Sequence, residues 1–301
     1  MKKFLIIQTA FIGDVVLATP LIEKLSKHFR DAKIDLLVRK GNEGLVKNHP
    51  KLRKTFIWDK QKAKYPHLLL LLRLIRKQEY DYVINVQRYF ASGFLTCFSG
   101  AKHKIGFIKN PFSFCFTIRA KHEMNGLHET ARNLQLIKSI TNSEYERPKL
   151  YPTEEDYERV QTYKELGKYV CIAPTSVWYS KQYPAEKWLE LILRIPDEIE
   201  IYLLGGKNDY DACEEIREMA EKPQVKNLAG KLSLLESAAL IKDAAINYVN
   251  DSAPLHIASA MNARTAAVFL STVPSFGFGP LGKFSEVIET KNPDAIRPYG
   301  I

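Results

Sequence analysis

The sequence predicts an α/β protein made of two domains, each built around a sheet of parallel strands. Short apolar runs of strand character alternate with segments of helical spacing, and this alternation occurs twice along the chain. The length of 301 residues suits two domains, and a hydrophobic content of 46% can supply two cores. Because parallel sheets bind ligands at the carboxyl ends of their strands, we expect a ligand site in a central cleft that the two domains face.

The first half begins with a buried strand that leads into an amphipathic helix. Helical spacing places Val15, Leu21 and Leu25 on the apolar side of that helix. The expected strands are Lys3–Gln8, Ile34–Val38, Thr55–Trp58, Asp81–Val86 and Lys104–Phe107. The expected helices are Asp14–Phe29, Gly41–Lys47, Tyr65–Lys77, Tyr89–Phe98 and Leu127–Ile140. The aromatic segment Asn110–Arg119 fits neither pattern.

The second half repeats the alternation after a polar segment with two prolines, Thr141–Pro152, which is the expected linker. We therefore expect domains at 1–145 and 146–301. The expected strands are Tyr169–Ala173, Ile199–Leu204, Val225–Leu228, Ala245–Val249 and a strand that ends at Phe269. The expected helices are Thr153–Leu166, Ala185–Ile195, Asn208–Ala220, Ser233–Lys242 and one that follows Ser252.

Charge is divided unequally between the two halves. Residues 1–150 hold 28 Lys and Arg against 12 Asp and Glu, a formal charge of +16, whereas residues 151–301 hold 16 against 22, a charge of −6. A basic half suggests an anionic partner such as nucleic acid, an acidic membrane surface or an acidic glycolipid. A lysine-rich surface that is simply solvated explains the same numbers.

Cysteine usage and hydropathy favour a cytosolic protein. The four cysteines at positions 97, 115, 171 and 213 have no C-x-x-C or metal-ligand spacing, so we expect four reduced thiols and no metal. The opening residues imitate a signal peptide, but Gln8 and Asp14 interrupt the apolar run, which predicts a strand and a helix instead. No segment reaches about 18 uninterrupted apolar residues, so we expect no membrane-spanning helix.

The most informative stretch is Ala245–Phe269, which reads as strand, tight turn, helix and strand. Ser252 stands at the N-cap position and Pro254 in the first turn, where proline is tolerated. A helix N-terminus at the carboxyl end of a strand can bind phosphate through backbone N–H groups and the helix dipole. A capped helix with no ligand is the alternative.

Other polar residues also follow expected strands. Thr175, Ser176 and Lys181 share one loop, where hydroxyls and an ammonium could hold a diphosphate; an ordinary polar loop is the alternative. Asp209 follows two glycines and could bind ribose, or it could begin a helix. Asp14 could serve as a general base at the carboxyl end of the first strand, or it could favour the dipole of its helix.

Two further residues flank the turn at Ser252. Asp251 could bind sugar hydroxyls, and His256 could donate a hydrogen bond to a phosphate. A single histidine on an amphipathic helix is more often a packed structural residue than a ligand.

Taken in order, these segments resemble bacterial heptosyltransferases of glycosyltransferase family 9. The resemblance is carried by FLIIQTAFIGDVVLATPLIEKL, PTSVWYSKQYPAEKW, LLGGKND, LAGKLSLLESAALI and NDSAPLHIASAMNARTAAVFLSTVP, which lie in both halves. It implies the GT-B fold, with two Rossmann-like domains that bind the acceptor in the N-terminal one and the nucleotide sugar in the C-terminal one. The stretch Val177–Tyr179 departs from better-known members and could alter the choice of donor.

The resemblance also implies a role for each candidate residue. Asp14 would be the general base, and Lys181, Thr175 and Ser176 would contact the donor phosphates. Asp209 would bind ribose, and Leu232 would lie against adenine. The family turn D-[ST]-[GA]-x-x-H at the diphosphate and sugar is matched by Asp251, Ser252, Ala253 and His256.

The implied activity is an inverting, metal-independent transfer of heptose from ADP-heptose to the lipopolysaccharide inner core, with no cofactor. The basic first half suits an acidic glycolipid acceptor, so we expect a cytoplasmic protein in peripheral contact with the inner membrane. The alternatives are transfer of another nucleotide sugar to another surface glycan, a non-catalytic nucleotide-sugar binder and a nucleic-acid binder. We expect no nucleic acid, because the chain has no basic-aromatic motif of a known module.

Overall fold

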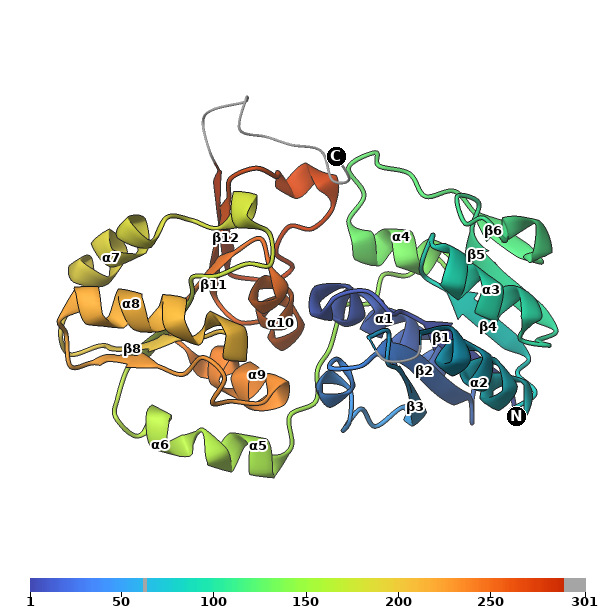
Figure 1. Ribbon diagram of the computed structural model, residues 1–301, viewed down its shortest axis with the longest axis horizontal. Coiled ribbons are helices and arrows are strands. Elements are labelled where there is room, and N and C mark those ends of the chain that lie inside the picture. Colours follow the sequence, from blue (N-terminus) through green and yellow to red (C-terminus); the bar gives the residue numbers. More distant parts are fainter. Residues whose placement is uncertain (62–63, 290–301) are drawn as a thin grey trace. The chain divides into compact units, whose positions relative to one another are not determined.

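The computed structural model describes residues 1–61 and 64–289, which form two compact units. Unit 1 is Met1–Lys149, and unit 2 begins at Leu150 (Figure 1). Each unit is built around one six-stranded sheet in which neighbouring strands pair in parallel. The predicted class, two α/β domains with parallel sheets, is confirmed.

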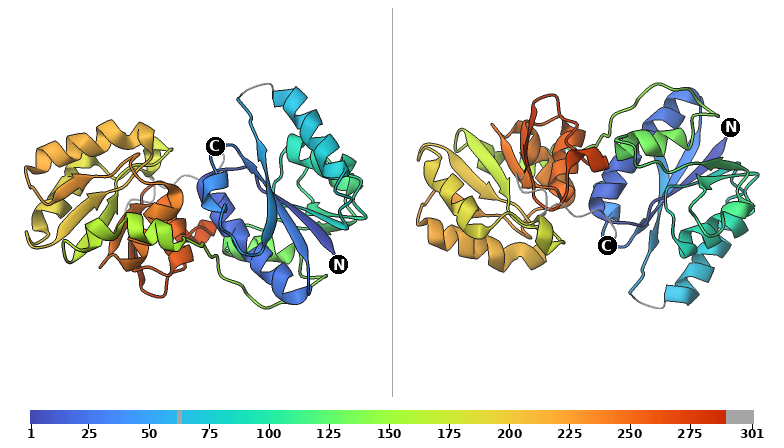
Figure 2. Two further views of the ribbon diagram at one scale, coloured as in Figure 1. Left: turned by 90° about the horizontal axis from the view of Figure 1, so that it is seen from below. Right: turned by 90° about the horizontal axis from the view of Figure 1, so that it is seen from above.

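The sheet of unit 1 has the order β3-β2-β1-β4-β5-β6. Its strands are β1 (Lys3–Ile7), β2 (Lys33–Arg39), β3 (Leu52–Trp58), β4 (Tyr82–Asn85), β5 (His103–Phe107) and β6 (Ile118–Ala120). Its helices are α1 (Ile12–His28), α2 (Lys64–Arg76), α3 (Phe90–Phe98) and α4 (Glu129–Gln135), with short 3-10 turns η1 (Glu43–Leu45) and η2 (Ser113–Cys115). Helices α1 and α4 cover one face of the sheet, and α2 and α3 cover the other (Figure 2).

The sheet of unit 2 has the order β12-β11-β10-β7-β8-β9. Its strands are β7 (Tyr169–Ala173), β8 (Glu200–Leu203), β9 (Val225–Asn227), β10 (Asn247–Asn250), β11 (Thr265–Phe269) and β12 (Ser285–Glu289). Its helices are α5 (Glu154–Arg159), α6 (Gln161–Lys164), α7 (Ala185–Arg194), α8 (Tyr210–Ala220), α9 (Leu234–Asp243) and α10 (Ala253–Met261), with turns η3 (Tyr179–Lys181), η4 (Lys207–Asp209) and η5 (Pro274–Phe276).

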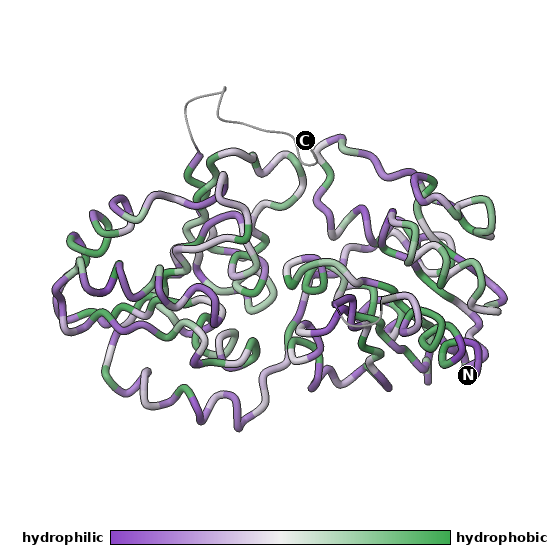
Figure 3. The backbone as a smooth tube through the Cα atoms, viewed as in Figure 1, coloured by the Kyte–Doolittle hydropathy of each residue, from purple (hydrophilic) through white to green (hydrophobic). Residues whose placement is uncertain are grey.

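Both cores lie between the sheet and its covering helices. The central strands β1 and β7 are buried along almost their whole length, as expected of parallel strands with helices on both faces. In unit 2 the core includes Trp188 of α7, Ile201 of β8 and Ile216 of α8. Figure 3 shows hydrophobic stretches inside each unit and hydrophilic ones over its outer helices and loops.

The structure differs from the sequence prediction in five elements. The predicted helix Thr153–Leu166 is wrong as one piece, because the helix breaks at Val160, whose N–H bonds to the carbonyl of Tyr157 three residues back. The regular helix within Leu127–Ile140 ends at Gln135, and Gly41–Lys47 contains only the short turn η1. Strands β6 and β12 were not predicted, since both are short edge strands without a continuous apolar run.

The prediction of four reduced cysteines is wrong for one pair. Cys97 of α3 and Cys115 of η2 form a disulfide, with their Cα atoms 5.5 Å apart. Their pairing depends on η2 packing against α3, which the spacing of the residues along the chain does not reveal. Cys171 and Cys213 are free and buried, and burial raises the pKa of the Cys213 thiol to about 12.

Asp35 of β2 is the most deeply buried acidic group of unit 1, and it forms the basis of a stability prediction. Its carboxylate accepts hydrogen bonds from Arg53 and from the hydroxyl of Tyr80. We expect Asp35→Ala to lower the free energy of unfolding by about 3 kcal/mol, because it leaves a buried hydroxyl and a guanidinium without their partner. The control Asp197→Ala removes an exposed partner of Lys222 and should lower the free energy of unfolding far less, because solvent screens an exposed ion pair. Urea unfolding measures both, and equal costs would contradict the prediction.

The pH dependence of stability should include a contribution from Asp81. The backbone N–H of Lys3, together with the ammonium of Lys102, holds the pKa of Asp81 below its ordinary value of 3.8. A lowered folded-state pKa stabilises the protein fully above the unfolded value and loses that effect as pH falls through the folded value. Asp81→Asn should therefore be less stable than wild type at about pH 6, with the difference shrinking towards about pH 3. Urea unfolding at both pH values tests this, and a constant difference would refute it.

Candidate functional site

The strand order of unit 2 defines where its ligand site should lie. From β7 the chain moves to β8 and β9 on one side, and from β10 it moves to β11 and β12 on the other. The loops that leave β7 and β10 therefore diverge, and ligands of open parallel sheets bind where neighbouring loops diverge at the carboxyl ends of the strands. The donor residues predicted from the sequence, from Thr175 to His256, follow β7, β8, β9 and β10 at this edge.

A buried ion pair joins the two loops at this switch point. The Nζ atom of Lys181, in η3 after β7, lies 2.7 Å from Oδ2 of Asp251, directly after β10. The hydroxyl of Thr272, after β11, donates to the same carboxylate oxygen at 2.7 Å. All three side chains are buried. An ammonium and a carboxylate removed from water must satisfy each other, so this pair fixes the position of Lys181.

Asn250, the last residue of β10, holds the preceding loop in place. Its side-chain amide donates to the carbonyl of Pro174 at 2.8 Å and accepts from the N–H of Tyr183 at 3.0 Å. The ends of the loop between β7 and α7 are thereby tied to the end of β10. Thr175 and Ser176 lie at the start of this loop and are half-buried.

Thr272 and Asn250 were both missed by sequence reasoning. Each contributes through tertiary contacts with residues far away in the sequence. The available signal was position: both are polar residues at, or just after, the carboxyl end of an expected strand.

Helix α10 begins as predicted, but Ser252 does not cap it with its side chain. Ser252 occupies the N-cap position with extended backbone, and its hydroxyl donates to the carbonyl of Asn250 at 3.4 Å. The hydroxyl therefore serves the turn after β10, and the prediction of a side-chain cap is wrong. Ala253 and Pro254 form the first turn, and the carbonyl of Ser252 accepts the N–H of Leu255 at 3.2 Å.

His256 lies one turn into α10 and is buried. Its ring meets that of Phe278 edge-on, with centroids 6.3 Å apart. These contacts agree with the structural alternative for this histidine, and its role towards a phosphate stays a prediction.

Asp209 and Leu232 lie on the side of β8 and β9. Oδ2 of Asp209 accepts the N–H of Gly206 at 2.7 Å, so its carboxylate stabilises the turn that begins α8. Gly230 lies so close to the backbone of Lys207 that a Cβ atom on residue 230 would be 2.9 Å from the Cα of Lys207. The φ of Gly230, +72°, also favours glycine. Leu232 is half-buried just before α9.

Asp14 belongs to unit 1 and lies at the equivalent switch point of that sheet, between β1 and β4. It is half-buried in the first turn of α1, and its Oδ2 accepts the N–H of Phe11 at 3.2 Å. The two neighbouring strand ends are joined by Thr9, whose hydroxyl donates to Oε1 of Gln87 at 2.7 Å. This contact agrees with the alternative role of Asp14, in which the carboxylate stabilises the start of its own helix. The carboxylate nevertheless lies at the carboxyl edge of the sheet, where a general base would act.

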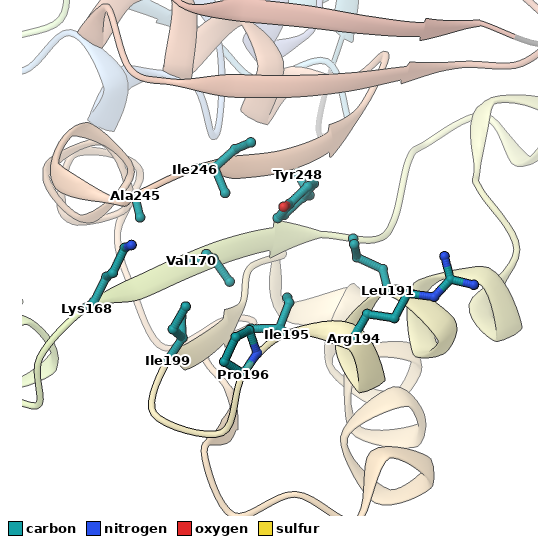
Figure 4. A pocket seen from close by; sticks show the side chains of 10 residues that line it. All are labelled: Lys168, Val170, Leu191, Arg194, Ile195, Pro196, Ile199, Ala245, Ile246 and Tyr248. Carbon is teal, nitrogen blue, oxygen red and sulfur yellow. The ribbon is translucent and has the colours of Figure 1, made fainter.

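A separate pocket of about 430 Å³ lies at the opposite edge of the sheet of unit 2. It is formed by α7 and the beginnings of β7 and β10, and its rim includes Lys168, Arg194 and Tyr248 (Figure 4). Lys168 precedes β7, Arg194 ends α7 and Tyr248 lies near the start of β10, so the pocket is distinct from the loops that hold Lys181 and Asp251.

Within 1–61 and 64–289, no three His, Cys, Asp or Glu side chains gather in a way that could hold a metal ion. Across the same residues, no helix combines the length and apolar character that crossing a bilayer requires.

Comparison with known proteins places this geometry in a family. Residues 69–296 match the model of glycosyltransferase family 9 (heptosyltransferase). The chain is 27% identical over 284 residues to lipopolysaccharide heptosyltransferase 3 of Escherichia coli, covering 87% of this chain and 82% of that protein. Its fold is similar to that of E. coli ADP-heptose LPS heptosyltransferase II, with a TM-score of 0.83 and 21% identity, covering 96% of this chain and 90% of that one. The structure of E. coli heptosyltransferase WaaC with ADP gives a TM-score of 0.77 and 18% identity, covering 98% and 94%.

The family model spans most of the chain, and both units have the Rossmann strand order that a GT-B protein requires. The chain therefore belongs to glycosyltransferase family 9, the heptosyltransferase family, and is a glycosyltransferase with the GT-B fold.

Proposed function

We propose that the protein transfers heptose from ADP-heptose to the inner core of lipopolysaccharide, with inversion at the anomeric carbon. The observation that carries the proposal is the buried contact of Lys181 with Asp251, at the edge of unit 2 where a nucleotide sugar would bind. Support for the sugar comes from the relatives, which are named lipopolysaccharide heptosyltransferases, and from the ADP in one solved neighbour.

Lys181 would stabilise the diphosphate as it leaves. Breaking the bond between the anomeric carbon and the donor oxygen leaves an additional negative charge on the diphosphate, and a positioned ammonium lowers the free energy of that transition state. Asp251 and Thr272 would act as positioning residues, because the Asp251 carboxylate accepts from the ammonium and Thr272 donates to that carboxylate. Thr175, Ser176 and the first turn of α10 at Ser252–Ala253 would supply further donors to the phosphates.

The remaining donor contacts would recognise the nucleoside and the sugar. Asp209 would accept from ribose hydroxyls, with its second carboxylate oxygen if Oδ2 keeps the N–H of Gly206. Leu232 would lie against adenine, and His256 would approach the phosphate or the sugar from α10.

Asp14 would act as the general base. The acceptor hydroxyl loses its proton to the Asp14 carboxylate while its oxygen forms a bond to the anomeric carbon and the diphosphate departs from the opposite face. This single displacement produces inversion and requires neither a metal ion nor a cofactor.

The acceptor would be an acidic glycolipid, which suits the excess of Lys and Arg in the first half. We accordingly propose a cytoplasmic location, with peripheral contact at the inner membrane and no nucleic-acid partner. Transfer of another nucleotide sugar to another surface glycan is the second candidate. It is favoured by the exposed stretch Val177–Tyr179, which lies within the donor loop between Ser176 and Lys181, where family members could differ in donor choice.

Removing the proposed base should affect turnover rather than donor binding. Asp14→Asn should lower kcat by about 10²-fold or more, since general-base catalysis contributes about 10²- to 10⁴-fold. The donor dissociation constant should stay the same, because the proposed donor contacts all lie in unit 2. The control Asp31→Asn changes an exposed aspartate after α1 and should leave both quantities unchanged. Steady-state kinetics and calorimetry measure them, and a kcat within a few-fold of wild type would exclude Asp14 as the base.

Removing the ammonium of Lys181 should weaken binding of the donor nucleotide. Lys181→Ala should weaken ADP binding by about tenfold or more, as expected when a charge-assisted hydrogen bond is lost. Lys187→Ala removes an exposed lysine of α7 that pairs with Glu190, and it should bind ADP normally. Thermal unfolding of both variants identifies any loss of fold.

Calorimetric titration with ADP-heptose, another ADP-sugar, a UDP-sugar and a GDP-sugar tests the donor itself. The proposal predicts that ADP-heptose binds most tightly. Tighter binding of a UDP- or GDP-sugar, with transfer from it, would support the second candidate instead.

A further inference from the structure

Unit 1 carries a cluster of five phenylalanines, three exposed and two half-buried, outside the site described above. We call Phe90, Phe94 and Phe98 of α3, together with Phe112 and Phe114 around η2, the aromatic patch. Phe90 is 64% exposed and Phe114 is 75% exposed, while Phe98 is also open to solvent. Clusters of exposed large apolar side chains are uncommon on single soluble domains and mark surfaces that meet another apolar phase or partner.

The rings of the aromatic patch contact one another. Phe90, Phe94 and Phe98 are spaced by four residues, which places them along one face of α3. Phe112 lies among them, with ring centroids 5.0 Å from Phe90 and 6.2 Å from both Phe94 and Phe98, and 6.0 Å from Phe114. The rings therefore form one continuous apolar surface.

One covalent bond and one set of hydrogen bonds hold η2 and the residues before it against α3. The Cys97–Cys115 disulfide joins the helix to the turn. The side-chain amide of Asn110 donates to the carbonyls of Gln87 and Tyr89 at 3.1 Å each. Gly93 permits this approach, because a Cβ atom there would lie 2.1 Å from Oδ1 of Asn110. The exposed rings are thus held in place by a rigid support.

The segment that carries the patch has charged residues of one sign. Residues 88–121 contain six Lys and Arg and not a single Asp or Glu. Arg88, Lys109 and Arg119 are exposed. A surface that combines exposed phenylalanines with cations and lacks carboxylates complements an anionic bilayer, whose headgroups attract the cations and whose interface accepts the rings.

Ring geometry favours a bilayer over nucleic acid. Proteins that bind single-stranded nucleic acid present aromatic faces on which bases stack. Here Phe90, Phe94 and Phe98 meet Phe112 edge to face, at interplanar angles of 69°, 74° and 74°, and Phe114 stacks on Phe112 at 29°. Such a cluster offers a continuous apolar surface with few open parallel faces.

The patch begins at the carboxyl edge of the sheet and extends towards the amino edge, because Phe114 lies three residues before Thr117, whose N–H donates to the carbonyl of Lys104 near the start of β5. Helix α3 follows β4, and Asn110 follows β5, so both segments leave the carboxyl edge of the sheet. Asp14 follows β1 at the same edge, and Thr9 and Gln87 join the ends of β1 and β4. The Phe90 end of the patch therefore shares the edge that carries Asp14.

We propose that the aromatic patch is the surface through which unit 1 enters the interface of an anionic bilayer. The inference rests on the proposed function only for its purpose, the presentation of a glycolipid acceptor; bilayer binding itself needs neither donor nor acceptor. The experiment uses the full chain and vesicles of phosphatidylethanolamine with phosphatidylglycerol, compared with vesicles of phosphatidylcholine alone.

Co-sedimentation with these vesicles gives the first measurement. The double substitution Phe90→Ser with Phe114→Ser should weaken binding to anionic vesicles by about tenfold or more, because two rings no longer enter the interface. Phe284→Ser is the matched control, since Phe284 is 55% exposed in unit 2, and it should bind as wild type does. Lys109→Glu should weaken binding roughly tenfold, whereas Lys168→Glu in unit 2 should leave it unchanged.

A fluorescent reporter gives a second measurement that does not depend on removing side chains. Phe114→Trp should show a blue-shifted emission with anionic vesicles and quenching by brominated lipid, while Phe284→Trp should show neither. An unshifted Phe114→Trp spectrum in the presence of bound vesicles would overturn the proposal.

Three other outcomes would also overturn it. The first is equal vesicle binding by the double variant and wild type. The second is a patch that mediates a dimer, seen as dissociation of the double variant in analytical ultracentrifugation without loss of vesicle binding. The third is tight, salt-dependent binding of single-stranded nucleic acid that the double variant loses. Turnover with a delipidated, water-soluble acceptor should stay unchanged in the double variant, which separates a failure of this proposal from a failure of the proposed transfer reaction.

Discussion

The parallel pairing of β7 with β10 is the constraint on which unit 2 depends. It places Asn247 beside Cys171 and Val249 beside Ala173, and so brings together two loops that are far apart in the sequence. Only this juxtaposition lets Lys181 meet Asp251 and lets Thr272 complete the contact. Because each charge would be costly to bury alone, the ion pair and the order of the sheet stabilise each other.

Unit 1 repeats the strand order of unit 2, but its switch point has a different chemistry. Its strand ends are joined by neutral polar side chains, Thr9 with Gln87, and Asn110 extends the network along the same edge. Asp14 is the acidic side chain in the first turn of α1. The same topology therefore presents an ammonium and hydroxyls in one unit and a carboxylate in the other. Under the proposed function, these groups serve the leaving diphosphate and the incoming hydroxyl.

The region between β4 and β6 combines features that look unrelated in the sequence. Cysteines, phenylalanines and basic residues occur there without a recognisable motif. In the structure the disulfide and the amide of Asn110 hold η2 against α3, and the phenylalanines gather on the outer surface that results. The same segment, residues 88–121, contains cationic residues and no acidic one. One tertiary contact, η2 on α3, thus decides both the redox state of the cysteines and the character of this surface.

Most of the fold was predictable, because buried parallel strands and amphipathic helices have distinct apolar periods. The ten strands expected from the sequence are all present, and only the short edge strands β6 and β12, with mixed composition, were missed. Helix breaks such as that at Val160 were not predictable, since they depend on packing as well as on local propensity.

The candidate site was likewise predictable in part from the sequence. The sequence by itself determined which side chains follow strands and therefore share an edge, including Lys181 and Asp251, because parallel strands align their carboxyl ends. Only the tertiary structure decided that these two pair, that Thr272 and Asn250 support them, that the hydroxyl of Ser252 bonds to its own turn, and that Cys97 meets Cys115. Such contacts are set by the order in which strands pair, and a linear pattern of apolar and polar residues does not contain that order.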